Sequence, residues 1–529
     1  LALKAANPIW ASLVDEAVAY QNFQKIEKKQ VLDHLDNAWR NTWIQFLESK
    51  HPVLTEVSTG IWEEDLDLLR EKVIEKSELV RKILLLKLRE NTYKNLDYNR
   101  LGNRTTFREL YHKASKKRMK PSLRQLWDEH SEELKRLLPA WLATPESVSA
   151  TWPMETGFDL VIFDESSQCF AERGIPAAFR GKQIVVVGDD KQLPPHHLFS
   201  ARWEEGEEDQ FSGQDSLLDL AKQFLPQRVL TQHYRSVYPE LIEFSNRYFY
   251  EGHLESIPDS TALQNRRPAI RFEKIEGQWK NQTNENEAIV ISKDLLEASK
   301  SQPESTFGVI TFNARQQELV EKAIEREFRM EGQSVPESLF VKNIENVQGD
   351  ERDHIYFSIG YAKAENGKVV SQFGSLGLPG GENRLNVAIS RARLSIVIVS
   401  SIYPDELPVS ESSPIGPRLL KKYLDFAHQI SRNELKAGLI AGNQEYGIDF
   451  KNFNSKFRNH SNLNLSFSDA AFQENDGMIS VYYWDGGRML LETSMKNYFV
   501  FKHSTLRQKG YNVHYRYSRN DWQSSSTLL

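Results

Sequence analysis

Five short runs of almost purely apolar residues lie in the middle of the chain, and they limit the possible fold more than any other feature. They are FDLVIF (158–163), QIVVVG (183–188), FGVITF (307–312), HIYFSIG (354–360) and LSIVIVSS (394–401). A strand that is apolar at nearly every position is buried on both faces, and cover by helices on both faces is typical of parallel sheets. We therefore predict an α/β protein built on parallel sheets.

Changes in composition and in the spacing of apolar residues along the chain suggest four regions. Residues 1–140 are polar and poor in glycine, and heptad-like apolar spacing predicts a long amphipathic helix there, which could pack on a partner helix. The apolar runs place part of a first sheet lobe at 141–228 and a second lobe at 229–430. Residues 431–529 are rich in Asn, Ser and aromatic residues, and we expect a small α/β domain there.

Composition excludes several classes of protein. The 529 residues include one cysteine, Cys169, so an intrachain disulfide and a cysteine-rich zinc site are excluded, and a reducing, cytoplasmic location is expected. No apolar run approaches the ~20 residues that cross a bilayer, so no membrane partner is expected. The formal net charge of −6 argues against a wholly basic nucleic-acid coat, although a local basic groove remains compatible with it.

The string LVIFDESSQ (160–168) delivers Asp164 and Glu165 at the end of an apolar strand. An Asp at such a strand end holds Mg²⁺ in nucleotide hydrolysis, and the adjacent Glu can orient or deprotonate the attacking water. Gln168 would then sense the γ-phosphate. Taken alone, the string is equally compatible with a capped strand end of no catalytic role.

A second strand ends in a similar way about twenty residues later, in VVVGDDKQLPP (185–195). Gly188, Asp189 and Gln192 follow the strand, and two prolines stiffen the loop. A glutamine between two active-site loops can couple the state of the phosphates to contact with a polymer. A turn that merely uses Gly and Asp would look similar, but the whole string favours the functional interpretation.

Three further strings follow in the second lobe. LTQHYRS offers Arg235, a fixed positive charge suited to a transferring phosphate, and Tyr234, which could stack on a base or pack in the core. ENVQGDERDHIYFS places Gln348, Gly349 and Glu351 just before a strand, where Glu351 could accept hydrogen bonds from a ribose.

The last string, RLNVAISRARLSIVIV, is predicted to be one helix followed by a strand, with every arginine on the helix. Arg384 and Arg391 are seven residues apart, so they would share a helix face. Arg391 is the candidate arginine finger. The alternative is an exposed helix whose arginines form surface salt bridges.

Residues ~141–430 resemble the motor core of a superfamily 1 helicase, in the branch of the nonsense-decay RNA helicase and the Dna2-type nuclease-helicases. DESSQ, GDDKQLPP, QHYRS, VQGDE and NVAISRAR match motifs II to VI of that family in order. The resemblance implies two RecA-like lobes, with ATP and Mg²⁺ in the cleft between them. Single-stranded DNA or RNA would lie across both lobes, with movement from 5′ to 3′. It also implies nucleic-acid contacts at Thr144, Pro145, Pro194, Asn313 and Arg384.

The chain departs from that family in one respect, because it contains no G-x-x-x-x-G-K-[ST] phosphate loop. The nearest string, FRGKQ (179–183), lacks the spacing and the hydroxyl. We expect a loop missing through N-terminal truncation, with residues 1–140 as a stalk and auxiliary insertion. The alternative is a degenerate motor that serves as a non-catalytic nucleic-acid-binding scaffold.

The tail resembles a very-short-patch-repair-endonuclease domain, as found in bacterial helicases of this branch. Asp469 and Glu492 match two of its acidic positions, on neighbouring strands, but Ser494 stands where a further carboxylate is wanted. A turn at 485–487 is predicted to join the strand that carries Glu492 to the strand before it. Two-metal chemistry needs several carboxylates. We expect a nuclease-like domain that binds nucleic acid or a partner protein, and the stalk is a second candidate for binding a partner protein. A working, helicase-coupled nuclease is the alternative. A role in bacterial defence or repair rests on analogy.

Overall fold

The computed structural model describes most of the chain and divides it into two compact units. One unit comprises residues 80–440, and the other comprises residues 1–79 together with 441–529. The described residues are 28–52, 59–94, 108–154, 157–195, 216–263, 267–369, 372–434, 461–463, 465, 468–474, 477–484, 494 and 497–516.

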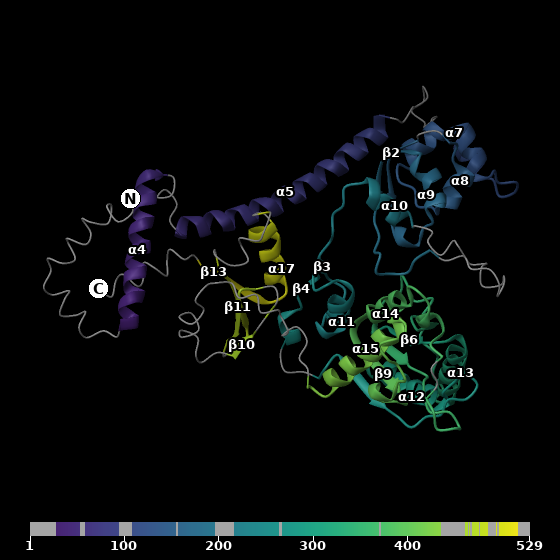
Figure 1. Cartoon of the computed structure of the whole chain (residues 1–529). Helices are drawn as coiled ribbons and strands as arrows, with labels where there is room; N and C mark the ends of the chain where they lie inside the picture. Colours follow the sequence, from purple (N-terminus) through teal and green to yellow (C-terminus); the bar gives the residue numbers. More distant parts are fainter. Residues whose placement is uncertain are drawn as a thin grey trace, which may run out of the picture. The chain divides into compact units, whose positions relative to one another are not determined.

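A five-stranded sheet forms the centre of the larger unit (Figure 1). Its order is β5-β9-β8-β6-β7, and every neighbouring pair is parallel. The strands are β5 (Ile270–Lys274), β6 (Phe307–Thr311), β7 (Phe340–Asn343), β8 (Arg352–Ser358) and β9 (Ala392–Ser400). The prediction of a parallel α/β fold is therefore confirmed, because three of the apolar runs form β6, β8 and β9.

Helices cover both faces of this sheet (Figure 1). One face packs on α12 (Glu285–Ser301) and α13 (Ala314–Met330), and the other packs on α11 (Glu240–Phe249), α14 (Gly381–Ile389) and α15 (Ile415–Ser431). Successive strand residues therefore enter different cores. In β6, Val309 packs with α12 and α13 while Ile310 packs on the opposite side, and both are fully buried.

The first-lobe residues form a smaller parallel sheet in which β1 (Phe158–Phe163) pairs with β2 (Gly181–Val186). One side of it packs with α9 (Ala171–Ala178) and α10 (Leu217–Phe224). Apolar side chains of both strands are nonetheless exposed, with Ile162 of β1 at 62%. Parallel sheets are normally buried on both faces, so the described residues leave this one partly uncovered.

The remaining elements of the larger unit are short. They are α6 (Arg108–Ala114), α7 (Leu123–Leu137), α8 (Pro145–Thr151), β3 (Gln232–His233), β4 (Glu255–Ser256), and the 3-10 turns η2 (Ser166–Gln168), η4 (Ser260–Leu263), η5 (Gly374–Gly377) and η6 (Pro404–Glu406). Helix α7 begins with a capping box in which Ser122 and Gln125 satisfy each other's backbone N–H groups. Trp127, Trp141 and Trp152 pack edge to face beside β1.

The smaller unit contains the beginning of the long helix predicted from heptad spacing. Helix α5 (Thr59–Lys94) begins in this unit, and α4 (Lys28–Lys50) precedes it. The tail adds a four-stranded sheet, in order β10-β11-β12-β13. Its elements are β10 (Ser461–Leu463), β11 (Ala470–Gln473), β12 (Ile479–Trp484), the π-helix η8 (Asn497–Lys502), α17 (His503–Gln508) and β13 (Tyr511–Arg516).

Two tail predictions lie outside the described residues, namely the turn at 485–487 and Glu492. None of the helices in the described ranges is both long enough and apolar enough to cross a bilayer.

Candidate active site

The turn after β1 is shaped by its own carboxylate and by β2. The Oδ1 of Asp164 accepts the N–H of Glu165 at 3.0 Å, and Glu165 adopts the left-handed region at φ 52° and ψ 39°. The N–H and Oγ of Ser166 both donate to the Val187 carbonyl, at 2.9 and 2.7 Å. Left-handed backbone at a non-glycine residue is costly and clusters at functional sites, so this turn is a candidate for one.

Gly188 allows the two strand ends to approach each other. A Cβ at that position would lie 2.7 Å from Ser166 Oγ and 3.0 Å from the backbone nitrogen of Ser167. Any side chain at Gly188 would therefore displace the DESSQ turn. The sequence predicted Gly188 as a site residue, and its place in the structure is this close backbone contact.

Asp189 organises the loop that follows β2. Its Oδ1 accepts the N–H of Lys191 at 2.9 Å, and its Oδ2 accepts hydrogen bonds from Gln192 Nε2 at 3.0 Å and from the Tyr250 hydroxyl at 2.7 Å. Burial, followed by the nearby Asp189 carboxylate, raises the pKa of Tyr250 above its usual value. Tyr250 therefore keeps its proton and acts as the donor.

Gln348 of the second lobe joins the two strand-end loops of the first. Its Nε2 donates to Glu165 Oε2 at 2.9 Å and to Gln192 Oε1 at 3.3 Å, while Gln168 Nε2 lies 3.5 Å from the same Glu165 oxygen. The Gln348 Oε1 is buried without a hydrogen-bond partner among the described residues. A buried acceptor of this kind suits a ligand or a water molecule that donates to it.

Two arginines carry positive charge into the same region. Arg235 Nε donates to Glu351 at 2.9 Å, and the role of Glu351 as a ribose acceptor stays a prediction. Arg391 is only 3% exposed and donates to the Val387 and Asp350 carbonyls. Burial and repulsion from Arg235 lower the pKa of Arg391 to about 10, and the carboxylate of Glu165 acts in the opposite direction. Arg391 remains a cation at neutral pH.

His233 supports the loop that carries Arg235. Burial and the charge of Arg235 lower the pKa of His233 to about 4, so the ring is neutral at pH 7. Its Nε2 can then accept the backbone N–H of Ser236, at 3.0 Å.

The prediction that one helix carries every arginine of the last string is wrong. Helix α14 ends at Ile389, Arg391 lies in the turn that follows, and Arg393 is already in β9. The physical reason is strand pairing, because Ala392 pairs with Arg352 of β8 and draws the chain into the sheet. Arg384 and Arg391 therefore do not share a helix face.

Tyr234 is 85% exposed, which rules out the alternative that it packs in the core. Gly349 adopts φ 84°, and a Cβ there would meet nothing within 4 Å, so the space beside it is open. Both residues flank the arginines in sequence. Their assigned roles, base stacking and close approach to a ligand, stay predictions.

The predicted nucleic-acid residues are dispersed, and none forms a hydrogen bond with the carboxylate loops within the described ranges. Thr144 caps α8, whose first residue is Pro145, and Asn313 caps α13 by accepting the Gln316 N–H at 2.8 Å. Pro194 is exposed, whereas Arg384 is only 8% exposed. The contacts expected of them stay predictions.

Three residues of the site were not predicted. Tyr250 follows α11 and has no motif around it, so only the fold reveals it. Asn383 and Asn386 of α14 donate to the carbonyls of Gln192 at 2.9 Å and Lys191 at 2.8 Å, holding the loop after β2. Their spacing of three on a helix, which places them on one face, was an available signal.

The carboxylates fit a magnesium ion that is shared with a nucleotide. Mg²⁺ is usually held by one or two carboxylates together with phosphate oxygens and water, rather than by an all-protein cage. Asp164 is an exposed carboxylate at a strand end, as such a site needs. Among the described residues no group of three or more His, Cys, Asp or Glu could hold a metal, and the tail is included in that finding as far as it is described.

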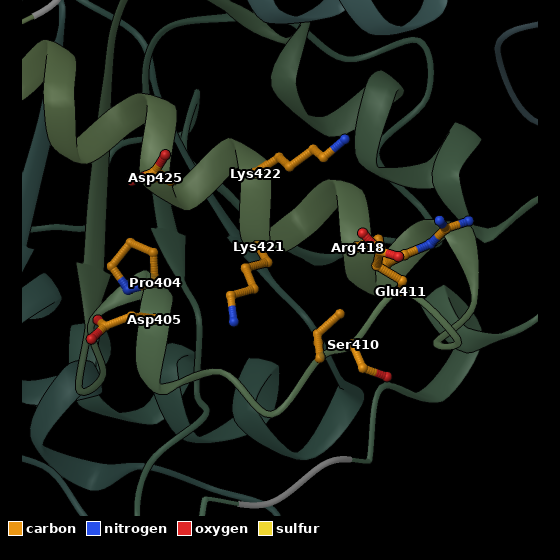
Figure 2. A pocket seen from close by; sticks show the side chains of 9 residues that line it. Pro404, Asp405, Ser410, Glu411, Arg418, Lys421, Lys422 and Asp425 are labelled. Atoms are coloured by element: carbon orange, nitrogen blue, oxygen red, sulfur yellow. The ribbon is translucent and has the colours of Figure 1, made fainter.

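A separate hollow of about 670 Å³ lies on the second lobe, between η6 and the start of α15 (Figure 2). Both acidic and basic groups line it, including Asp405, Glu411, Arg418 and Lys421. Lys421 Nζ donates to the Leu407 carbonyl at 3.1 Å. The mixed lining shows no preference for one charge, and this hollow is distinct from the carboxylate site.

Comparisons with known proteins match the part of the chain that forms this site. Two family models, both described as AAA domain, match residues 112–198 and 214–403. An uncharacterized ATP-dependent helicase of Mycoplasma genitalium, MG140, is 37% identical over 58% of this chain and 29% of its own length. The chain belongs to the superfamily 1 helicases.

Further relatives place this helicase chain in the branch of SEN1 and the regulator of nonsense transcripts 1. Helicase SEN1 of Saccharomyces cerevisiae is 27% identical over 46% of this chain and 11% of its own length. A regulator of nonsense transcripts 1 homolog of Neurospora crassa is 28% identical over 46% of this chain and 22% of its own length. The chain thus spans less than a third of each of these relatives.

Proposed function

We propose that the full-length protein is an ATP-driven motor that moves along single-stranded nucleic acid. The observation that carries this proposal is the bridge from Gln348 to both Glu165 and Gln192. It brings a strand-end carboxylate, a loop glutamine and the second-lobe arginines into one site. Such a site is suited to a reaction whose progress must be sensed by both lobes.

The residues have distinct roles in this mechanism. Asp164 would hold Mg²⁺, which would offset charge on the phosphate oxygens when the nucleotide is bound. Glu165 orients the attacking water and accepts its proton. Arg235 and Arg391 place fixed positive charge where negative charge develops during phosphoryl transfer. Gln192 and Gln348 transmit the state of the site between the lobes.

We infer that the phosphate loop lies outside these 529 residues, which contain no such motif. The partly uncovered β1–β2 sheet, with Ile162 62% exposed, supports the presence of further strands in the full-length protein. The greater length of the relatives supports the same proposal. We infer that these strands carry the loop, and that this chain alone binds ATP weakly.

Direction and substrate class follow from the family and belong to the same proposal. We propose movement from 5′ to 3′ on DNA or RNA, with nucleic acid lying across both lobes. A strand-displacement assay on duplexes with a 5′ or a 3′ overhang tests the direction. Unwinding from the 3′ overhang alone would contradict it.

The decisive experiment measures ATP hydrolysis by the full-length protein with oligo(dT) or oligo(U) as stimulant. Wild type is expected to be stimulated, and Glu165→Gln is expected to lose hydrolysis while retaining binding of a fluorescent ATP analogue. The physical reason is that Asp164 remains to hold the metal, whereas the water loses its base. Glu172→Gln, an exposed neighbour, is the matched control. Normal turnover in Glu165→Gln, or wild type that binds nucleic acid but never hydrolyses ATP, would contradict the proposal.

A further inference from the structure

The loop between β5 and α12 is held in an unfavourable backbone conformation. Asn281 and Gln282 are consecutive non-glycine residues with φ of 52° and 66°. Lys280 and Thr283 exchange backbone hydrogen bonds at 3.0 and 2.9 Å, which closes the loop into a tight turn. Such strain persists only where the surroundings hold it, and it is concentrated at functional sites.

The loop carries a tryptophan whose ring packs on a second aromatic side chain. The Trp279 indole stacks on Tyr361, with ring centroids 5.9 Å apart and an angle of 26° between the planes. Its backbone N–H donates to the Lys363 carbonyl at 3.1 Å. Tyr361 is buried, whereas Trp279 is part-exposed. The indole is therefore fixed in place and still reachable from solvent.

The indole and the amide of Asn313 border the same buried glycine, Gly360. Gly360, at φ 76°, lies between them, because a Cβ added there would be 3.6 Å from Trp279 and 4.0 Å from Asn313 Nδ2. Asn313 was predicted to contact nucleic acid on other grounds. Trp279 had no assigned role, and its position beside Asn313 gives it one.

A buried hydrogen-bond network holds this surface from beneath. Glu287, with no exposed area, accepts the Gly360 N–H at 2.7 Å and the Ser358 hydroxyl at 2.9 Å. Gln316 links Ser358 to the first residue of the α12 cap, Asn284, at 2.9 and 3.0 Å. The ends of β8, α12 and α13 are therefore fixed relative to one another.

The charge around the indole favours an anion. Lys280 and Arg315 are exposed, and neither forms an ion pair with any described residue. Arg315 also donates to the Asn281 carbonyl at 3.4 Å, which ties it to the loop. The nearby acids have their own partners, because Glu406 pairs with Lys363 at 2.9 Å and Glu276 lies 3.4 Å from Lys274.

We propose that Trp279, Lys280, Arg315 and Asn313 form a binding subsite for single-stranded nucleic acid on the second lobe. One base stacks on the indole, while the lysine and arginine contact the flanking phosphates. Aromatic stacking beside a basic groove is the common way of holding a single strand without reading its sequence. This subsite rests on the proposed motor function, because it names where the second lobe holds the strand.

The test is fluorescence anisotropy of the full-length protein with labelled oligo(dT) and oligo(U), without nucleotide, over a series of salt concentrations. Trp279→Ala should weaken binding by about 5- to 150-fold, the range measured for one stacked base. Trp279→Phe should restore most of that loss, because it keeps an aromatic face. Arg315→Ala should weaken binding and reduce the slope of log affinity against log salt by about 0.7. The two oligonucleotides show whether the subsite distinguishes DNA from RNA.

Arg326→Ala is the matched control, since Arg326 is another exposed arginine on α13, eleven residues and about 16 Å further along the helix. It should bind as wild type. Folded Trp279→Ala or Arg315→Ala variants with unchanged affinity would overturn the subsite, as would an unchanged salt slope in Arg315→Ala or equal losses in Arg315→Ala and Arg326→Ala. Wild type that binds neither oligonucleotide would instead overturn the proposed motor function, so the two failures are distinguishable.

Discussion

At the residue scale, the site depends on charged side chains that the fold holds within a few ångströms of their partners. Glu165 receives a hydrogen bond from Gln348, and Arg235 is paired with Glu351 at 2.9 Å. Arg391 is buried and satisfied largely by carbonyl groups. Guanidinium groups held in this way need little reorganisation when negative charge develops, which is the source of electrostatic catalysis.

We predict that Arg235→Ala and Arg391→Ala each lower kcat for ATP hydrolysis by at least ~10²-fold, the usual cost of losing such a group. The measurement is steady-state ATPase of the full-length protein, with melting temperature recorded for each variant. Arg393→Ala is the control, because Arg393 pairs with Asp353 at 3.4 Å and is half exposed. Loss of nucleic-acid affinity with normal kcat would contradict the assignment.

We predict that Glu287 makes stability depend on pH. Burial raises the pKa of Glu287 from 4.5 to about 7. Its carboxylate also accepts five hydrogen bonds, which favour the ionised form and oppose this shift. At a pH between 4.5 and 7, Glu287 keeps its proton in the folded state but has lost it in the unfolded state. The contribution of Glu287 to stability is therefore full below pH 4.5 and falls as the pH rises to 7, by about 3 kcal/mol.

Urea unfolding of wild type and Glu287→Gln at pH 5 to 8 measures this pH-dependent contribution of Glu287 to stability. The difference in unfolding free energy between the two should shrink with rising pH, because the Gln side chain does not titrate. Glu285→Gln, which changes an exposed carboxylate two residues earlier in the same helix, should show no such trend. A difference that stays constant from pH 5 to pH 8 would show that Glu287 does not titrate in this range.

At the element scale, the beginning of α5 belongs with the tail sheet inside the smaller unit. Trp62 packs edge to face on Phe499 at 6.0 Å, and Arg70 Nε donates to the Phe499 carbonyl at 2.8 Å. The Arg70 guanidinium also lies over the Tyr515 ring, 5.7 Å from its centroid. A helix far from the tail in sequence is thus part of the tail's core.

We predict that Leu66→Ala destabilises the smaller unit by about 2–5 kcal/mol, the cost of a cavity in a core. Leu66 is 5% exposed, whereas Leu68 in the same helix is 52% exposed. Leu68→Ala should therefore change stability by less than about 0.5 kcal/mol. Hydrogen exchange of the backbone amides in β13 measures the effect, and equal protection in the two variants would show that α5 does not support the tail.

At the scale of the whole molecule, the candidate site is assembled from segments far apart in sequence. Gln348 and Glu165 are separated by 183 residues and Asn386 and Lys191 by 195. Both contacts lie inside the larger unit, where a first-lobe loop meets second-lobe helices. Coupling between ATP turnover and movement would pass through such contacts.

We predict that Tyr250→Phe uncouples the lobes without abolishing nucleotide binding. The variant loses the hydroxyl that donates to Asp189 and accepts from Asn386, at 2.7 and 3.0 Å. A hydrogen bond to a charged group contributes ~1.5–3 kcal/mol, so stimulation of ATPase by nucleic acid should fall about tenfold or more. Tyr248→Phe, which changes a 38% exposed tyrosine near the end of α11, two residues earlier, is the control. Unchanged stimulation in Tyr250→Phe would mean that this contact does not couple the lobes.

The sequence by itself determined the parallel sheet, the strand-end carboxylates and the order of the motifs. These follow from local patterns, because an apolar run and the polar residues that end it are neighbours in the chain, as with Asp164 after β1. The end of α14 was mispredicted for the converse reason, since pairing of Ala392 with Arg352, forty residues earlier, ends the helix.

Only the tertiary structure decided which side chains meet. Nothing local to Glu351 indicates that Arg235 will bind it, and nothing local to Trp279 indicates that Gly360 and Asn313 will lie beside it. Tyr250 likewise sits in no recognisable motif, yet it joins Asp189 to Asn386. The physical reason is that hydrogen bonds and ring contacts depend on distances of a few ångströms, and those distances are set by the packing of segments far apart in the chain.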